Sequence, residues 1–370
     1  MNKLLLALLA LCALTTAHGN DFATTAEKAN WYRGNTNAHS INAEGNVAAD
    51  VVVRWYREHG YQFLFLTENE QLIDVKPLNA LYGARSAILA AYSFVVLRGQ
   101  EVTQRLADES HPDGMRRAHV NGLGTNNLVM PVGSEGNVGL ARSVSMSELY
   151  VRNFAAVRAA GGIPQVNHPN FRWSVKPQDL SAVSGPFLFE IANASPGANN
   201  FGAAADNGDE VLSTEAFWDV LLSQGKTAWA VASDDSHDYL HLDDFNSERP
   251  GKGWIMLRAV ELTPATVQDA LLRGDFYAST GVTLADYRAN ATSVSIKITR
   301  SRDRREDKSK PKDDRRFTTR FIGKQGRVLA TIGGLEPTYT IRGDEGYVRA
   351  TIVDSNGMSA WTQPVFIRSR

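Results

Sequence analysis

Residues 47–60, VAADVVVRWYREHG, and residues 61–70, YQFLFLTENE, decide the fold class. The first stretch has apolar residues at helical spacing and stops at Gly60, so it predicts a helix. The second stretch is typical of a buried strand that opens into a polar loop. Helical and strand patterns of this kind alternate to about residue 285, which predicts an α/β protein built on a parallel sheet.

Further helices are predicted at 78–91, 147–162, 213–226 and 263–274, and further strands at 92–101, 163–170, 187–195, 227–237 and 253–259. So many units favour a barrel over an open sheet, although periodicity alone leaves both possible.

After about residue 285 the apolar residues recur with period two, in stretches such as SVSIKIT (293–299) and RVLATIG (327–333). This pattern, with its glycine and asparagine punctuation, predicts a small antiparallel β domain over 285–370. Residues 301–316, SRDRREDKSKPKDDRR, interleave both charge signs, which argues against a nucleic-acid patch and favours a solvated loop.

The first 19 residues have the features of a signal peptide: MNK is basic, LLLALLALCAL is apolar and TTAHG is small. The apolar run is shorter than the ~20 residues of a membrane span, so we expect cleavage after Ala17 or Gly19 and a periplasmic or secreted protein. The only cysteine, Cys12, would leave with this segment. Any metal would then be bound by histidine and carboxylate.

The chain has 370 residues and a formal net charge of −1, so no overall field attracts nucleic acid or an anionic membrane. Its length allows one large domain, predicted at 20–284, and a smaller one.

Polar residues with chemical potential cluster where the predicted strands end. They are His39, Glu44, Glu68, Asn69, Glu101, His119, His168, Asp235 and His237. Because loops at the carboxyl ends of parallel strands converge, these residues are expected to meet in one cavity. Asp235 and His237, at D-x-H spacing, can ligate one metal ion or two adjacent ones. Taken singly, each of the others could be an ordinary loop or surface residue.

The ordered motifs N-x-H-S, A-E-G, T-E-N, G-x-E, H-x-N, N-H-P and D-x-H resemble the polymerase and histidinol phosphatase (PHP) superfamily of metal-dependent phosphoesterases. The resemblance runs from about Trp31 to Gly281 and includes YRGN (32–35) and GDFYASTG (274–281). Within that superfamily, the chain is similar to the secreted branch with a C-terminal β domain. The resemblance implies a distorted seven-stranded, TIM-like β/α barrel.

The resemblance also implies two or three divalent ions, Zn, Mn or Fe. One centre would use His39, Glu101 and Asp235. A second would use Glu101 as a bridge with His119 and His168, and a third would use His237 with the Glu44 and Asn69 loops. Glu101, Asp235 and His237 are expected to carry the catalytic chemistry.

This sequence departs from the family pattern in three loops. Asn37 stands for the first histidine of H-x-H, Glu44 for an aspartate, and Thr67-Glu68-Asn69 for T-D-H. Asn37 and Asn69 are therefore expected to be weak ligands at best, and Glu68 a changed carboxylate ligand.

The predicted function is hydrolysis of a small phosphate mono- or diester. Arg33 and Arg172 are candidates to bind the phosphate, because guanidinium matches its geometry, although ordinary surface arginines would look the same. The alternative is a catalytically impaired protein that binds a phosphorylated ligand or metal without turnover. In a third interpretation, the C-terminal β domain is the working part and docks to envelope polymer or a partner protein.

Overall fold

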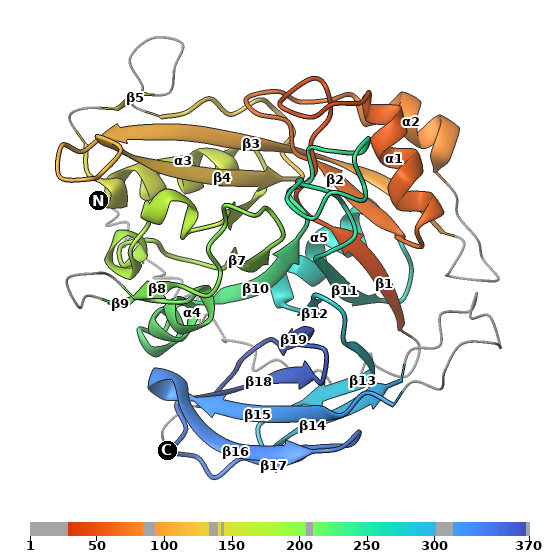
Figure 1. The fold of residues 1–370 in the computed structure, drawn as a ribbon, viewed down its shortest axis with the longest axis vertical. Helices are drawn as coiled ribbons and strands as arrows, with labels where there is room; N and C mark the ends of the chain where they lie inside the picture. Colours follow the sequence, from red (N-terminus) through yellow and green to blue (C-terminus); the bar gives the residue numbers. More distant parts are fainter. Residues whose placement is uncertain are drawn as a thin grey trace, which may run out of the picture.

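The computed structural model describes residues 29–83, 93–132, 140–141, 144–204, 210–300 and 314–367. The predicted signal peptide, most of the charged loop and residues 84–91 of one predicted helix lie outside these ranges. Within them the chain is a mixed α/β protein, with a large mixed sheet and a separate three-stranded antiparallel sheet (Figure 1).

Five α-helices are described, and most begin where a side chain caps the first turn. They are α1 (Ala49–Glu58), α2 (Val75–Tyr82), α3 (Met146–Ala159), α4 (Thr214–Ser223) and α5 (Pro264–Arg273). Ser145, Ser213 and Thr263 each accept a hydrogen bond from the backbone N–H three residues on. Helix α5 ends at Gly274, which adopts φ 74°. None of the described helices is long and apolar enough to cross a membrane.

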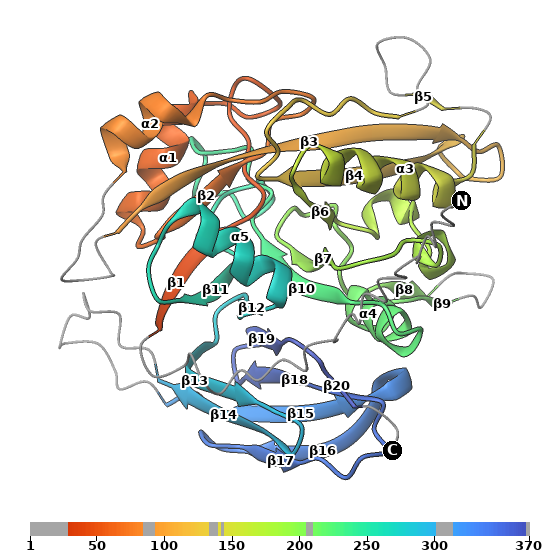
Figure 2. The same ribbon diagram turned by 180° about the vertical axis from the view of Figure 1, so that it is seen from behind.

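The α/β part of the large sheet has nine strands in the order β10-β7-β6-β4-β3-β2-β1-β11-β12. Their bounds are β1 (Asn30–Asn35), β2 (Phe63–Leu66), β3 (Val95–Ala107), β4 (Met115–Leu123), β6 (Ile163–Val166), β7 (Phe187–Asn193), β10 (Ala228–Ser233), β11 (Trp254–Ala259) and β12 (Phe276–Ser279). Short strands β5 (Leu140–Ala141), β8 (Ala203–Ala204) and β9 (Glu210–Val211) lie outside this order. In Figure 2, helices α3 and α5 lie in front of the sheet.

The prediction of a parallel sheet is wrong, because the sheet is mixed. Strands β1–β2–β3 and β6–β7–β10 pair in parallel, whereas β4 and β11 run antiparallel to their neighbours. For β4 the reason lies in residues 108–114, where Gly114 (φ 65°) and the Asp108 side chain form a tight connection. A hairpin this short returns β4 antiparallel to β3, since a parallel neighbour requires a long crossover.

The sheet curls until β10 lies against β11 and β12. The Gln363 side chain closes this approach: its Oε1 accepts from Ala230 N at 2.8 Å and its Nε2 donates to Ala230 O at 2.8 Å. The carboxamide thus satisfies the N–H and C=O of Ala230 as a neighbouring strand would. At the centre of the sheet, all four residues of β2, FLFL, are buried.

The C-terminal strands pair antiparallel, as predicted, but they do not form a single sheet. They are β13 (Thr283–Ala289), β14 (Ser293–Thr299), β15 (Phe317–Gly323), β16 (Arg327–Gly333), β17 (Thr338–Thr340), β18 (Tyr347–Asp354), β19 (Ser359–Thr362) and β20 (Val365–Phe366). Strands β13, β14 and β17 form the three-stranded sheet, whereas β19 pairs with β12 and joins the rest to the large sheet.

A buried ion pair also links the two parts. Arg349 of β18 is fully buried and donates to Asp219 of α4 from Nε (2.7 Å) and Nη2 (2.6 Å), and from Nη1 to Glu215 (3.0 Å). Because the guanidinium has no access to water, these two carboxylates stabilise its positive charge in place of solvent.

Asp219→Ala should therefore lower the free energy of unfolding by about 3–5 kcal/mol, since it leaves a buried charge without its main partner. Urea unfolding measures this effect. The control is Arg152→Ala, which breaks the exposed pair with Glu148 on α3 and should change stability by less than about 1 kcal/mol. Equal effects of the two substitutions would contradict the structural role of the Arg349 pair.

Candidate metal centre

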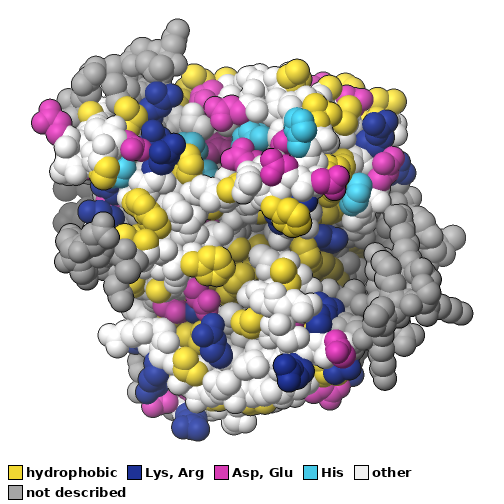
Figure 3. Space-filling model, viewed as in Figure 1, with side chains coloured by type: hydrophobic (Ala, Val, Ile, Leu, Met, Phe, Trp, Pro, Cys, Tyr) yellow, Lys and Arg dark blue, Asp and Glu magenta, His cyan; other side chains and the backbone are white. Residues whose placement is uncertain are grey.

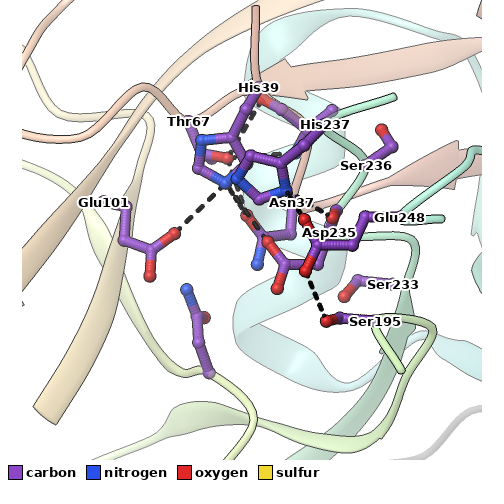
Figure 4. A network of polar contacts seen from close by, with 12 residues as sticks. Asn37, His39, Thr67, Glu101, Ser195, Ser233, Asp235, Ser236, His237 and Glu248 are labelled. Atoms are coloured by element: carbon purple, nitrogen blue, oxygen red, sulfur yellow. Dashed lines mark hydrogen bonds and ion pairs between the residues drawn. The ribbon is translucent and has the colours of Figure 1, made fainter. Parts of the chain in front are cut away.

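Two short segments, residues 37–39 after β1 and residues 235–237 after β10, are bonded backbone to backbone. Asp235 N donates to Asn37 O and His39 N to Ser236 O, both at 3.0 Å. This bridge brings the N-x-H and D-x-H motifs side by side although they are far apart in the sequence (Figure 4).

Glu101 and His119 do not lie at strand ends, contrary to the prediction. Glu101 is inside β3 and His119 inside β4, where Thr103 pairs with His119. The two side chains nevertheless meet, because adjacent antiparallel strands place neighbouring residues of one face close together. His168 joins them from the loop after β6.

The first group of ligating atoms surrounds the Nε2 atom of His39. Glu101 Oε2 and Asp235 Oδ1 both lie 3.2 Å from it, and Asn37 Oδ1 lies at 3.1 Å. All four side chains are buried. His237 belongs to the same group and stacks on His39, with ring centroids 4.3 Å apart.

The second group consists of Glu101, His119 and His168. Glu101 Oε1 lies 2.7 Å from His119 Nδ1 and 3.8 Å from His168 Nε2. Asp235 Oδ2 is also 3.8 Å from His168 Nε2. Glu101 and Asp235 therefore each direct one oxygen to the first group and the other to the second.

These residues fit a pair of divalent cations. One imidazole nitrogen carries at most one proton and cannot donate to three oxygens, but ligands of a common ion at ~2.1 Å stand about 3 Å apart. The shared cavity, of about 80 Å³, is lined by Glu44, Asn69, Glu101, His119, His168, Phe171, Ser195, Ala198, Asp235, His237 and Glu248. No lysine or arginine is among these described lining residues, so a cation would balance the carboxylates.

His237 is oriented by groups outside the cluster. Its Nδ1 lies 2.9 Å from the backbone oxygen of Asp235 and 3.2 Å from Glu248 Oε2. Ser195 Oγ in turn donates to Glu248 at 2.7 Å. Metal-binding histidines commonly donate one ring N–H to such acceptors and ligate through the other nitrogen.

Of the remaining candidate ligands, two line the cavity and one does not. Asn69 and Glu44 line the cavity, and Asn69 Oδ1 is buried without a hydrogen-bond partner among the described residues. Glu68 does not reach the cavity: its carboxylate accepts from Ser40 N at 3.1 Å and from Ser40 Oγ at 2.5 Å. The longer glutamate side chain turns back onto its neighbouring loop instead.

Neither predicted arginine lines the metal cavity. Arg33 is held between the rings of Tyr61 and Trp254, with Cζ 4.1 and 3.8 Å from the centroids. Arg172 is exposed and lines a separate cavity of about 420 Å³, which shares Phe171 with the metal cavity.

Two buried carboxylates beside the centre were not predicted. Glu190 of β7 accepts five hydrogen bonds, from Asn37, Gln165, His168 N, Asn193 and Ser233. Asp234 accepts from Asn35, Tyr56, Lys252 N and Gly253 N. A charged residue inside the apolar strand FLFEIAN is a sequence signal that could have identified Glu190.

Two of the candidate ligands have strained backbones. Asp235 adopts φ 48° and His168 adopts φ 22°, in a region that residues other than glycine rarely occupy. Glu190 accepts a hydrogen bond directly from His168 N. Asn193 Nδ2 donates both to Glu190 Oε2 and, at 3.1 Å, to Asp235 Oδ2, so it links these two carboxylates. Such strain persists only where the surroundings hold it, and it concentrates at functional sites.

The electrostatics favour the charged forms of His39, His168 and Glu101. Burial would lower the pKa of His39, but its hydrogen bonds to Asp235 and Glu101 outweigh this and raise the pKa to about 10. The same balance, with Glu101 as the main partner, raises the pKa of His168 to about 9. Burial raises the pKa of Glu101, but the bonds from His119, His168 and His39 hold it well below its usual range.

On the face shown in Figure 3, Asp, Glu and His side chains gather across the upper part, over the α/β elements. The metal cavity includes exposed Glu44 and half-buried His237 and Glu248. The rim of the cavity thus includes acidic side chains.

No family model matches the sequence, and no curated protein matches it. Among solved structures, the chain is similar to a two-domain protein from Bacteroides vulgatus ATCC 8482 containing a predicted PHP-like metal-dependent phosphoesterase. The identity is 14%, the TM-score 0.42, and the match covers 88% of this chain and 91% of that chain.

A candidate metal-dependent phosphoesterase from Bifidobacterium adolescentis ATCC 15703 has 12% identity and a TM-score of 0.35, with 65% of this chain and 96% of that chain covered. The lesion-specific endonuclease PfuEndoQ from Pyrococcus furiosus has 10% identity and a TM-score of 0.35, with coverages of 66% and 56%. At these identities the likeness concerns the fold alone.

Metal uptake by metal-free protein should release protons near pH 7, because His39 and His168 are protonated below their raised pKa values and must be neutral to ligate. The release should therefore decline as the pH rises through about 9 and then about 10. Calorimetry in buffers of different ionisation enthalpy measures it. His168→Gln should reduce the release, whereas His241→Gln, an exposed control, should not. Metal uptake without proton release would contradict the raised pKa values.

Proposed function

We propose that the chain is a metal-dependent phosphoesterase that hydrolyses a small phosphate mono- or diester at this centre. One observation carries the proposal: Glu101 and Asp235 each direct their two oxygens to two different histidine-containing groups. Carboxylates shared in this way suit a pair of ions a few Å apart, the arrangement that many phosphate-ester hydrolases use. We take the curled sheet as the distorted barrel expected from the PHP resemblance.

When bound, a pair of divalent cations supplies a water of lowered pKa and clamps the phosphoryl oxygens. The protein's own groups fix the position of that chemistry. Glu101 and Asp235 hold the two groups together, and Glu248 orients His237. Without cations, the carboxylates of the cavity would repel a phosphate, so activity should depend wholly on metal.

The cavity beside the centre gives the substrate a second place to bind. Arg172, Trp173 and His111 line it, and Phe171 separates it from the metal cavity. We propose that Arg172, and not the enclosed Arg33, meets the substrate beyond the reacting phosphate. We also propose that the protein works outside the cytoplasm after loss of residues 1–19.

A second candidate function is binding without turnover. It is favoured by Glu68, which turns away from the cavity, and by Glu44, which is exposed. A third ion would therefore lack part of its ligand set.

Metal content distinguishes these functions most directly. Elemental analysis of the protein from its native compartment should find about two ions per chain, because two groups of ligands share Glu101. One ion or none would favour the binding function.

Glu101→Gln should lower metal-dependent hydrolysis of p-nitrophenyl phosphate esters by more than about 100-fold, since even changes to residues behind the ligands cost 10–100-fold. Release of p-nitrophenol gives the rate. Glu148→Gln, the same change on the exposed face of α3, is the control and should leave the rate unchanged. Wild-type rates in Glu101→Gln, with the fold intact by circular dichroism, would remove the bridging role.

A further inference from the structure

Asn37 replaces the first histidine of the H-x-H motif, and its side chain makes specific hydrogen bonds. It is fully buried, and its Nδ2 donates to Glu190 Oε1 at 3.2 Å. Both oxygens of Glu190 also accept from other donors, among them Gln165 and the His168 N–H, so the NH₂ group of Asn37 faces this carboxylate. The amide oxygen is thereby directed to the other side.

A contact from Thr67 supports the same orientation. Its Oγ1 accepts the N–H of Ala38 at 3.1 Å and lies 2.9 Å from Asn37 Oδ1. The Thr67 hydroxyl can then donate to Asn37 Oδ1 at 2.9 Å or to the backbone oxygen of Ala38 at 3.3 Å, and the shorter contact is the one to Asn37. Oδ1 also lies 3.1 Å from His39 Nε2, beside Glu101 and Asp235.

Glu190 is suited to hold Asn37 and not to ligate. Oε1 accepts from Asn37, Gln165 and Ser233, and Oε2 accepts from His168 N and Asn193. With both oxygens occupied and no exposed surface, Glu190 is a positioning residue behind the centre.

We propose that Asn37 is an oxygen ligand of the first group, locked in orientation by Glu190, and that it shifts this group toward Mn²⁺ relative to Zn²⁺. Oxygen donors from Asn37, Glu101 and Asp235 then outnumber the nitrogens of His39 and His237. Imidazole suits zinc, whereas carboxylate and carbonyl oxygens suit manganese. This proposal rests on the metal centre of the proposed function.

The test is metal binding to the metal-free full chain, without substrate. Mn²⁺ is titrated by the loss of its free-ion paramagnetic resonance signal, and Zn²⁺ by competition with a coloured chelator. Glu190→Gln should weaken Mn²⁺ binding by about 10–100-fold, because a glutamine NH₂ group replaces one acceptor oxygen and lets Asn37 turn.

The double variant Asn37→Asp with Glu190→Gln should restore Mn²⁺ affinity at least to the wild-type value. Its aspartate can offer only oxygen, and its glutamine can donate to that aspartate. Asn37→His should raise the Zn²⁺/Mn²⁺ affinity ratio by about tenfold or more. Asn42→Asp, in the exposed part of the same loop, is the control and should change neither affinity.

Wild-type Mn²⁺ binding in Glu190→Gln, or a double variant no better than Glu190→Gln alone, would overturn the proposal. If circular dichroism shows that Glu190→Gln does not fold, the Zn²⁺/Mn²⁺ affinity ratio of Asn37→His becomes the test. An unchanged ratio would then overturn the proposal. Because hydrolysis is not measured, an absence of turnover would count against the proposed function and not against this ligand assignment.

Discussion

The carboxylate of Glu101 is the interaction on which the centre depends. It is buried inside β3, and its two oxygens contact three imidazoles, those of His39, His119 and His168. A charge in this position is tolerable only when opposite charges surround it. Asp235 and Glu101 together raise the pKa values of His39 and His168, so these rings hold protons that burial alone would remove. A divalent cation can replace those protons.

The framework around Glu101 explains why the centre needs a mixed sheet. His119 reaches Glu101 only because β4 runs antiparallel beside β3, and His39 reaches it through the bridge between residues 37–39 and 235–237. His168 and Asp235, which both have positive φ values, are hydrogen-bonded to Glu190 and to Asn193, respectively. The fold's regular part supplies one carboxylate and one imidazole, and loops supply the rest, with strained backbones at His168 and Asp235.

The sequence predicted the members of the cluster more accurately than it predicted the strands and loops that bring them together. Periodicity located β2, α1 and α4, because their apolar residues are buried on predictable faces. It could not show that the 108–114 turn makes a hairpin, which made the parallel-sheet prediction wrong. Nor could spacing show that Glu68 folds back onto Ser40, since a flexible side chain follows its nearest donors. None of the sequence motifs contains Glu190, yet its place in the apolar stretch FLFEIAN marks it as a buried charge that needs partners.

The pair Asn37–Glu190 shows why an amide suits this position. An aspartate at residue 37 would offer a stronger oxygen, but it would set one carboxylate against another across about the 3.2 Å that now separates Asn37 from Glu190. An asparagine carries a donor and an acceptor on the same carbon, so satisfying Glu190 with its NH₂ group directs its oxygen to the centre. Glu190 is already required by His168 and Asn193. Once that buried carboxylate is in place, a neutral amide adds a metal-binding oxygen without adding a further negative charge.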